Sequence, residues 1–131
     1  MASASRASSS YQVCGGVDAP ALARREILTR YDWPSQRLRD EAAIMLAELV
    51  TNAVLHGGVR PDDKVRVDVE IADRTVTFSV FDPGPGFERA APNAPGPSGG
   101  FGLIIVDRLA QRWGVVSGAA GTRVWFALPL G

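Results

Sequence analysis

The stretch that decides the fold is Glu48-Leu49-Val50-Thr51-Asn52-Ala53-Val54-Leu55-His56. It ends a segment, Ala42–Leu55, that is apolar on nearly every face of a predicted helix, yet Glu48 and Asn52 interrupt it. Because residues four apart lie on one side of a helix, a carboxylate and an amide are presented together. Burying a charge without a partner is costly, so we expect this pair to meet an external ligand. A hydrated divalent cation carried by phosphates would suit both groups.

Composition places the chain among ordinary globular proteins. Its 131 residues are 46% hydrophobic and 21% charged, which is enough for one domain with a core. The formal net charge is zero and no basic stripe is present, so we do not expect a nucleic-acid partner.

The numbers of cysteine and histidine residues limit the disulfides and metal sites that the chain can form. The single cysteine, Cys14, excludes an internal disulfide, and with only one histidine a zinc site of His and Cys ligands cannot form within one chain. The first residues lack the apolar centre of a signal peptide, and no apolar run reaches the roughly 20 residues of a membrane span. We therefore expect a cytosolic protein without a membrane partner.

The pattern along the chain predicts a disordered Ser/Ala-rich segment over residues 1–10 and a single domain over residues 11–131. Period-2 alternation predicts a hairpin in which strands of about 65–71 and 76–80 are joined at Asp73-Arg74. The other expected elements are an edge strand (11–14), helices over 18–30, 35–57 and 102–113, and strands over 115–117 and 122–128. Residues 82–100, rich in Pro and Gly, are expected to be a loop.

This order of elements predicts an α+β fold. Helices would cover one face of a mostly antiparallel sheet, which makes a two-layer sandwich.

Two glycine-containing segments are candidates for contact with a nucleotide. Asp82-Pro83-Gly84-Pro85-Gly86 follows a buried strand, where glycines permit close approach of a flat ligand and a carboxylate can accept a hydrogen bond from an exocyclic amine. Gly99-Gly100-Phe101-Gly102-Leu103 opens a helix, whose unpaired N–H groups favour phosphate. Taken singly, each segment is also consistent with an ordinary turn. Taken alone, Thr122 is likewise consistent with the ordinary start of a strand. His56 taken alone is consistent with a cation at a helix C-terminus, where the helix dipole favours positive charge.

Taken in order, these segments resemble the GHKL superfamily of ATP-binding proteins, which includes DNA gyrase, Hsp90, histidine kinases and MutL. Glu48-x-x-x-Asn52 resembles its N box, Asp82-x-Gly84-x-Gly86 its G1 box and Gly100-x-Gly102 its G2 box. Gly121-Thr122 resembles the motif of its last strand. The similarity covers about residues 18–130 and implies the ATP-binding sandwich of that superfamily.

Within the superfamily, the chain is most similar to the anti-sigma factor serine kinases. The residues that carry this similarity are Ala47–His56, Gly99–Leu103 and the closing Gly121-Thr122…Leu128-Pro129. The resemblance implies two partners, a sigma factor that the protein sequesters and an anti-anti-sigma protein of the STAS type that it phosphorylates on serine. Because such kinases commonly dimerise, it also leaves a homodimer open, with the hydrophobic hairpin as a candidate interface.

The resemblance further implies roles for individual residues. Asn52 would be a magnesium ligand, Asp82 the reader of adenine, Glu48 the base that takes the serine proton, and Arg24 a partner contact. The remaining nucleotide contacts would come from the glycine segments and the last strand: Gly84, Gly86, Gly100, Gly102, Leu103 and Thr122. ATP and Mg²⁺ are the implied cofactors.

Two other functional classes remain open from sequence. One is a nucleotide-gated binding module with little kinase activity, which is favoured by five prolines between Asp82 and Gly99. The other is the detached catalytic domain of a sensor histidine kinase, which is disfavoured because no dimerisation helix pair is present.

Overall fold

The computed structural model describes residues 6–56, 59–82, 101–119 and 121–131. Its elements, in chain order, are β1 (Arg6–Cys14), α1 (Ala19–Leu28), α2 (Gln36–His56), β2 (Lys64–Ala72), β3 (Thr75–Asp82), α4 (Phe101–Leu109), β4 (Arg112–Gly118) and β5 (Gly121–Pro129). Within these residues, no helix is long and apolar enough to cross a membrane.

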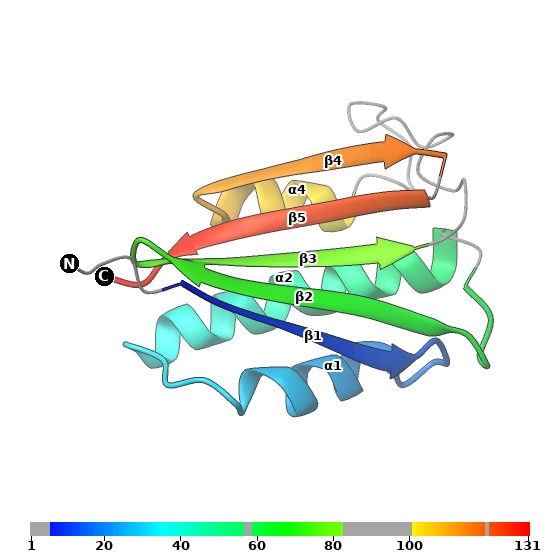
Figure 1. Ribbon diagram of the computed structural model, residues 1–131, viewed down its shortest axis with the longest axis horizontal. Helices are drawn as coiled ribbons and strands as arrows, with labels where there is room; N and C mark the ends of the chain where they lie inside the picture. The colour runs from blue at the N-terminus through cyan, green and yellow to red at the C-terminus, as the bar shows by residue number, and fades with distance from the viewer. Residues whose placement is uncertain (1–5, 57–58, 83–100, 120) are drawn as a thin grey trace.

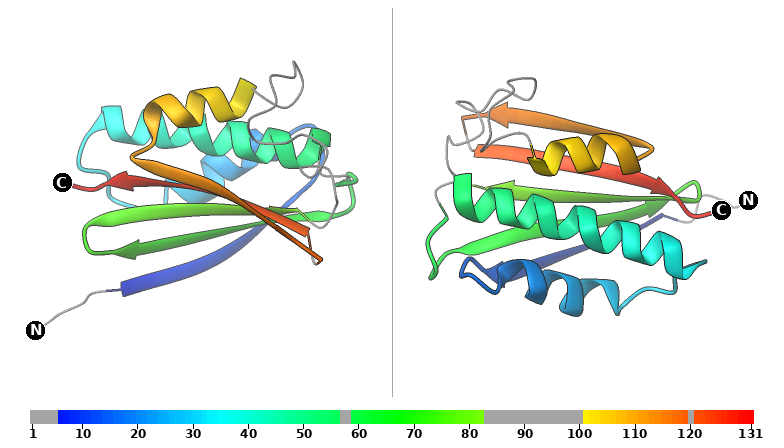
Figure 2. Two further views of the ribbon diagram at one scale, coloured as in Figure 1. Left: turned by 90° about the horizontal axis from the view of Figure 1, so that it is seen from above. Right: turned by 180° about the vertical axis from the view of Figure 1, so that it is seen from behind.

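The strands form one five-stranded sheet in the order β1-β2-β3-β5-β4. Each neighbouring pair is antiparallel. All three described helices pack on the same face of this sheet, as Figure 1 and the edge-on view in Figure 2 show. The predicted α+β two-layer sandwich is therefore confirmed.

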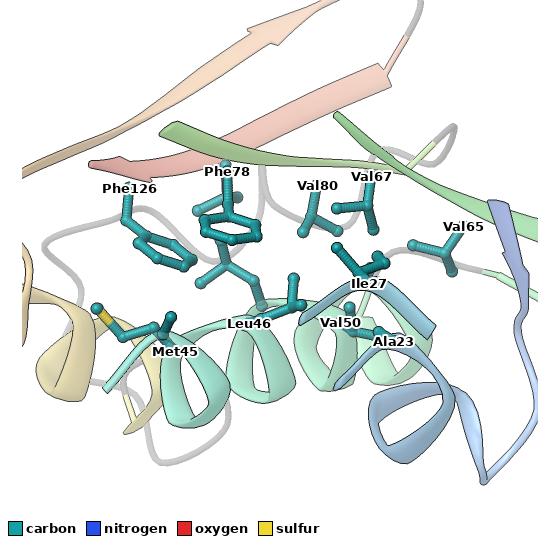
Figure 3. Packing of buried hydrophobic residues seen from close by; sticks show 14 of the residues in the cluster. Ala23, Ile27, Met45, Leu46, Val50, Val65, Val67, Phe78, Val80 and Phe126 are labelled. Carbon is teal, nitrogen blue, oxygen red and sulfur yellow. The ribbon is translucent and has the colours of Figure 1, made fainter. Parts of the chain in front are cut away.

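The core lies between the sheet and α2. Helix α2 begins after Ser35, whose hydroxyl accepts a hydrogen bond from the Leu38 N–H at 3.1 Å and so caps the helix as predicted. The side chains that α2 buries are spaced at helical intervals: Ala42, Met45, Leu46, Leu49, Val50 and Ala53. Opposite them, the ring of Phe78 stacks on that of Phe126, with 5.1 Å between centroids (Figure 3). The Phe78 ring also stacks on that of Trp33, with 6.3 Å between centroids.

The N-terminal prediction needs correction. Residues 6–10, which we expected to be disordered, belong to β1, while residues 1–5 lie outside the described part of the chain. The strand forms because β1 pairs with β2 over its whole length, from Arg6 opposite Ala72 to Cys14 opposite Lys64. Two side-chain contacts support the pairing: Arg6 forms an ion pair with Glu70 at 2.6 Å, and the Ser10 hydroxyl donates to Asp68 at 2.6 Å.

The last helix is shorter than predicted. Helix α4 ends at Leu109, and Trp113, which we expected to be helical, lies in β4 opposite Phe126. Pairing with the sheet sets this boundary, because the Gln111 N–H donates a hydrogen bond to the Ala127 carbonyl of β5 and β4 begins at the next residue. The indole N–H of Trp113 in turn donates to Asp107 at 2.8 Å.

Candidate functional site

Polar side chains are rare in the core. Among the described residues only four polar side chains are buried: Asn52 (7% exposed), Ser79 (5%), Asp82 (4%) and Thr122 (3%). Three of these four, Asn52, Asp82 and Thr122, are residues that the sequence predicts to contact a ligand. Buried polar groups require hydrogen-bond partners, so the presence of these three side chains among buried residues needs a physical explanation.

Helix α2 supplies two of the nominated side chains. Asn52 is buried and Glu48, one turn earlier, is half-buried. The side-chain nitrogen of Asn52 is fully buried, and no hydrogen-bond partner for it is found within the described residues. An unsatisfied buried donor costs about 1–3 kcal/mol. A position that carries this cost fits a residue kept for a ligand rather than for stability.

Strands β3 and β5 supply a carboxylate and a hydroxyl. Asp82 is the last residue of β3 and lies directly opposite Thr122, near the start of β5. Alternation places both on the same face as Val80 and Val124, which is the face that the helices cover. The Thr122 hydroxyl lies 3.5 Å from that of Ser117. The pair therefore presents a carboxylate and a hydroxyl toward the helical layer.

These elements meet at one end of the molecule. In Figure 1 and in the rear view of Figure 2, the C-terminal end of α2 lies at the same end as the last residues of β3, the start of β5 and the start of α4. Helix α2 also packs directly against β3, β5 and α4. At the start of α4, Gly102 lies in the first turn and Leu103 is 3% exposed.

The remaining nominated residues are placed as follows. Arg24 is exposed on α1. Gly84, Gly86 and Gly100 lie outside the described residues. His56 is the last residue of α2.

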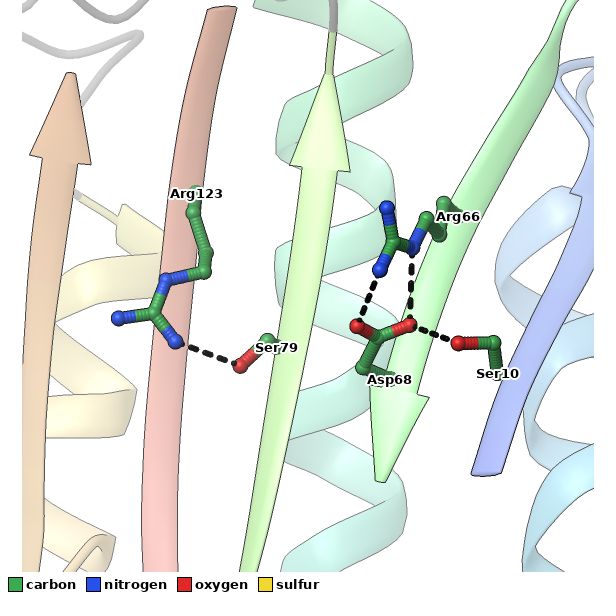
Figure 4. Close-up of polar contacts among 5 residues, drawn as sticks. All are labelled: Ser10, Arg66, Asp68, Ser79 and Arg123. Carbon is green, nitrogen blue, oxygen red and sulfur yellow. Dashed lines mark hydrogen bonds and ion pairs between the residues drawn. The ribbon is translucent and has the colours of Figure 1, made fainter. Parts of the chain in front are cut away.

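Sequence reasoning missed a second polar cluster, on the sheet face that the helices leave uncovered. We call this face the open face; its central rows are Arg66, Phe81, Arg123 and Val116, then Asp68, Ser79, Trp125 and Gly114. The Arg66 guanidinium donates two hydrogen bonds to Asp68, at 2.9 and 2.8 Å, and Arg123 donates to Ser79 at 3.2 Å (Figure 4). Partial burial raises the pKa of Asp68, but the hydrogen bonds from Arg66 and Ser10 outweigh it and hold that pKa below its usual range.

The only sequence signal for this cluster was period-2 alternation. It put Arg66 and Asp68 on one face of their strand. It gave no indication that Arg123, distant in sequence, would lie in the same row.

Residues 18–128 match the family described as the histidine kinase-like ATPase domain. The chain belongs to this family. Membership implies that this ATPase-domain chain binds ATP, and it supports activity as a kinase or an ATPase. Comparison with curated protein sequences gave no match.

Solved structures share the fold of this ATPase-domain chain. The RsbU and RsbW domains of Rv1364c from Mycobacterium tuberculosis align with a TM-score of 0.72 and 22% identity, over 95% of this chain and 32% of that one. The histidine kinase domain of the Erythrobacter litoralis EL346 blue-light activated histidine kinase aligns with a TM-score of 0.56 and 25% identity, over 70% of this chain and 44% of that one. This chain thus spans less than half the length of either solved chain.

Proposed function

We propose that this chain is an ATP-dependent protein serine kinase that also binds a sigma factor, and that its substrate is an anti-anti-sigma protein of the STAS type. The family match and the motif resemblance support the class of activity. The observation that carries the proposal is the buried Asn52 amide, whose nitrogen has no hydrogen-bond partner among the described residues and which lies one turn from Glu48.

Asp82 and Thr122 would bind the adenine base. Asp82 is buried at a strand end, where its carboxylate can accept a hydrogen bond from the adenine amino group. Thr122 lies opposite it and offers a hydroxyl to the same ligand. Gly84 and Gly86 would allow the base to approach the backbone, while Gly100, Gly102 and Leu103 would place the start of α4 at the phosphates.

Asn52 would hold a magnesium ion bound to those phosphates. Magnesium prefers oxygen ligands and usually takes only one or two protein groups beside nucleotide phosphates, so a single amide oxygen is a suitable contribution. When bound, the ion neutralises phosphate charge during transfer.

Glu48 would act as the general base. It lies one turn from Asn52 on the same side of α2, and its half-buried carboxylate remains accessible to an incoming hydroxyl. It would take the proton from the substrate serine while the serine oxygen bonds to the γ-phosphorus and ADP departs. Arg24, exposed on α1, would contact the protein partner.

A nucleotide-gated binding module with little kinase activity is the second candidate. It is favoured by the prolines between Asp82 and Gly99, because each fixes one backbone dihedral and restricts the conformations of that segment. The two candidates use the same nucleotide site and differ in whether Glu48 moves a proton.

Calorimetry with ATP tests the site itself. Titrations with and without magnesium, on the parent and on Asn52→Ala, should show that the substitution weakens the magnesium-dependent part of binding by about tenfold or more. Equal affinities of parent and variant in both conditions would count against Asn52 as the magnesium ligand.

Phosphotransfer from γ-labelled ATP to serine-bearing anti-anti-sigma candidates separates the two functions. Glu48→Ala should abolish transfer while ATP binding is retained. Glu41→Ala, on the same helix two turns earlier, is the matched control and should leave transfer intact. Undetectable transfer by the parent would favour the binding module.

A further inference from the structure

The open face carries an excess of positive charge. Alternation and strand register place five basic residues on it, namely Arg6, Lys64, Arg66, Arg112 and Arg123. They place only two acidic residues there, Asp68 and Glu70. The whole chain has a formal net charge of zero, so this face departs from the average of the molecule.

Both acidic residues are already paired. Glu70 contacts Arg6, and Asp68 contacts Arg66 and Ser10. For Lys64, Arg112 and Arg123, no carboxylate lies within salt-bridge distance anywhere in the described part of the chain. These three cations are therefore available to an external anion.

An apolar hollow lies among these cations. Its volume is about 560 Å³, and its lining includes Lys64, Arg66, Phe81, Val116 and Arg123 from the open face, together with Asp82 and Thr122. The Arg66 guanidinium lies over the Phe81 ring, 4.6 Å from its centroid, and Val116 is 52% exposed. An aromatic ring and an exposed aliphatic side chain flanked by cations match a ligand that carries carboxylates beside an apolar group.

We propose that the open face is a docking surface for an acidic segment of a partner protein, with carboxylates at Lys64 and Arg123 and an apolar side chain at Phe81 and Val116. A second copy of this chain is a poorer occupant, because it would bring the same excess of positive charge against itself. The cations and Phe81 lie on the face of the sheet opposite α2, and the hollow among them also borders Asp82 and Thr122. Docking of an acidic segment requires neither nucleotide nor phosphotransfer, so the inference does not rest on the proposed kinase activity.

The three tryptophans allow a direct test. Trp125 lies on the open face, whereas Trp33 stacks on Phe78 in the core and Trp113 donates its indole N–H to Asp107. The probe is a short peptide of glutamates with a central phenylalanine, titrated into ¹⁵N-labelled protein without nucleotide. The indole signal of Trp125, assigned with Trp125→Phe, should shift, while those of Trp33 and Trp113 stay in place.

Charge reversal supplies the comparison. Arg123→Glu should weaken binding of the peptide by about tenfold or more, since close interfacial charge pairs contribute at least that much. Arg37→Glu is the matched control and should bind like the parent, because this side chain is 89% exposed at the start of α2. Thermal unfolding of both variants checks that each is folded.

Four outcomes would overturn the proposal. The first is that the Trp125 signal does not shift, and the second is that both charge reversals weaken peptide binding equally. The third is that pyrophosphate or duplex DNA causes the same Trp125 shift as the peptide. The fourth is that the protein self-associates in sedimentation and that Arg123→Glu abolishes this self-association. The last two would assign the surface to a small anion or nucleic acid, and to a second copy of the chain, respectively.

Discussion

Asn52, which we propose as the magnesium ligand, is a residue whose burial carries a cost in stability. Its amide nitrogen is fully buried without a hydrogen-bond partner in the described part of the chain, although its neighbours Leu49 and Ala53 are packed core residues. An apolar side chain at this place would avoid the desolvation cost. If Asn52 binds the ligand as proposed, folding and ligand binding place different requirements on this position.

We expect Asn52→Ala to leave the free energy of unfolding unchanged or to raise it by up to about 1 kcal/mol. The substitution removes an unsatisfied donor and introduces the best helix former. Urea unfolding measures the effect. Leu49→Ala on the same helix is the comparison and should lose about 2–5 kcal/mol. A comparable loss in Asn52→Ala would show that its amide has a stabilising partner.

Gly15 and Gly16 form a matched pair of adjacent residues with different surroundings. A Cβ at Gly15 would lie 2.4 Å from Val59 Cγ1 and 2.6 Å from the Arg60 carbonyl oxygen, whereas a Cβ at Gly16 meets nothing within 4 Å. Gly15→Ala should therefore lower the free energy of unfolding by about 1–3 kcal/mol. Gly16→Ala should stay within about 0.5 kcal/mol of the parent. Chemical denaturation of both variants checks this, and equal effects would contradict the packing argument.

At the scale of elements, local pattern decided what each segment becomes, but contacts with distant strands decided where it ends. Strands β2 and β3 follow the predicted alternation, since one of their faces is buried under the helices. The start of β1 and the end of α4 differ from prediction, because β2 and β5 supply hydrogen-bond partners that local sequence does not reveal.

The turn between β2 and β3 can be improved. Asp73 and Arg74 both have positive φ, 53° and 61°, as a two-residue type I′ hairpin turn requires. Arg74→Gly should raise the urea midpoint, with a gain of roughly 0.5–1 kcal/mol, because glycine adopts positive φ without steric cost. Arg74→Val should lower it, since β-branched residues are strained there. The reverse order of the two midpoints would show that Arg74 side-chain contacts dominate.

At the scale of the whole molecule, β1 is tied to the helical layer through two tyrosines. The hydroxyls of Tyr11 on β1 and Tyr31, which follows α1, lie 2.7 Å apart. Burial, together with the hydrogen bond to Tyr11, raises the pKa of Tyr31 from its ordinary value of 10.0 to about 12.

This raised pKa predicts a loss of stability in alkali. The folded protein keeps the Tyr31 proton up to about pH 12, whereas the unfolded chain releases it near pH 10.0. The contribution is therefore fully present below pH 10.0 and is lost as the pH rises to about 12. Tyr31→Phe should show a shallower decline of urea stability over this range. Identical slopes in parent and variant would contradict the shift.

Several candidate site residues stand out in the sequence because their residue types contradict their surroundings. Glu48 and Asn52 stand out in an apolar helix, and Asp82 ends a hydrophobic strand. The open-face cluster was not predictable, since Arg66 and Arg123 come together only through strand order and register.

The sequence by itself determined the class of each element, the helix cap at Ser35, the hairpin turn and the order of the motifs, because these depend on residues close together in the chain. Only the tertiary structure decided the strand order β1-β2-β3-β5-β4, the extent of β1 and the alignment of Asp82 with Thr122. It also left one sheet face uncovered by the described helices and gathered on it three cations that have no carboxylate partner in the described part of the chain. The physical reason is that register and layer packing are set by hydrogen bonds and burial between distant segments, which a local pattern does not record.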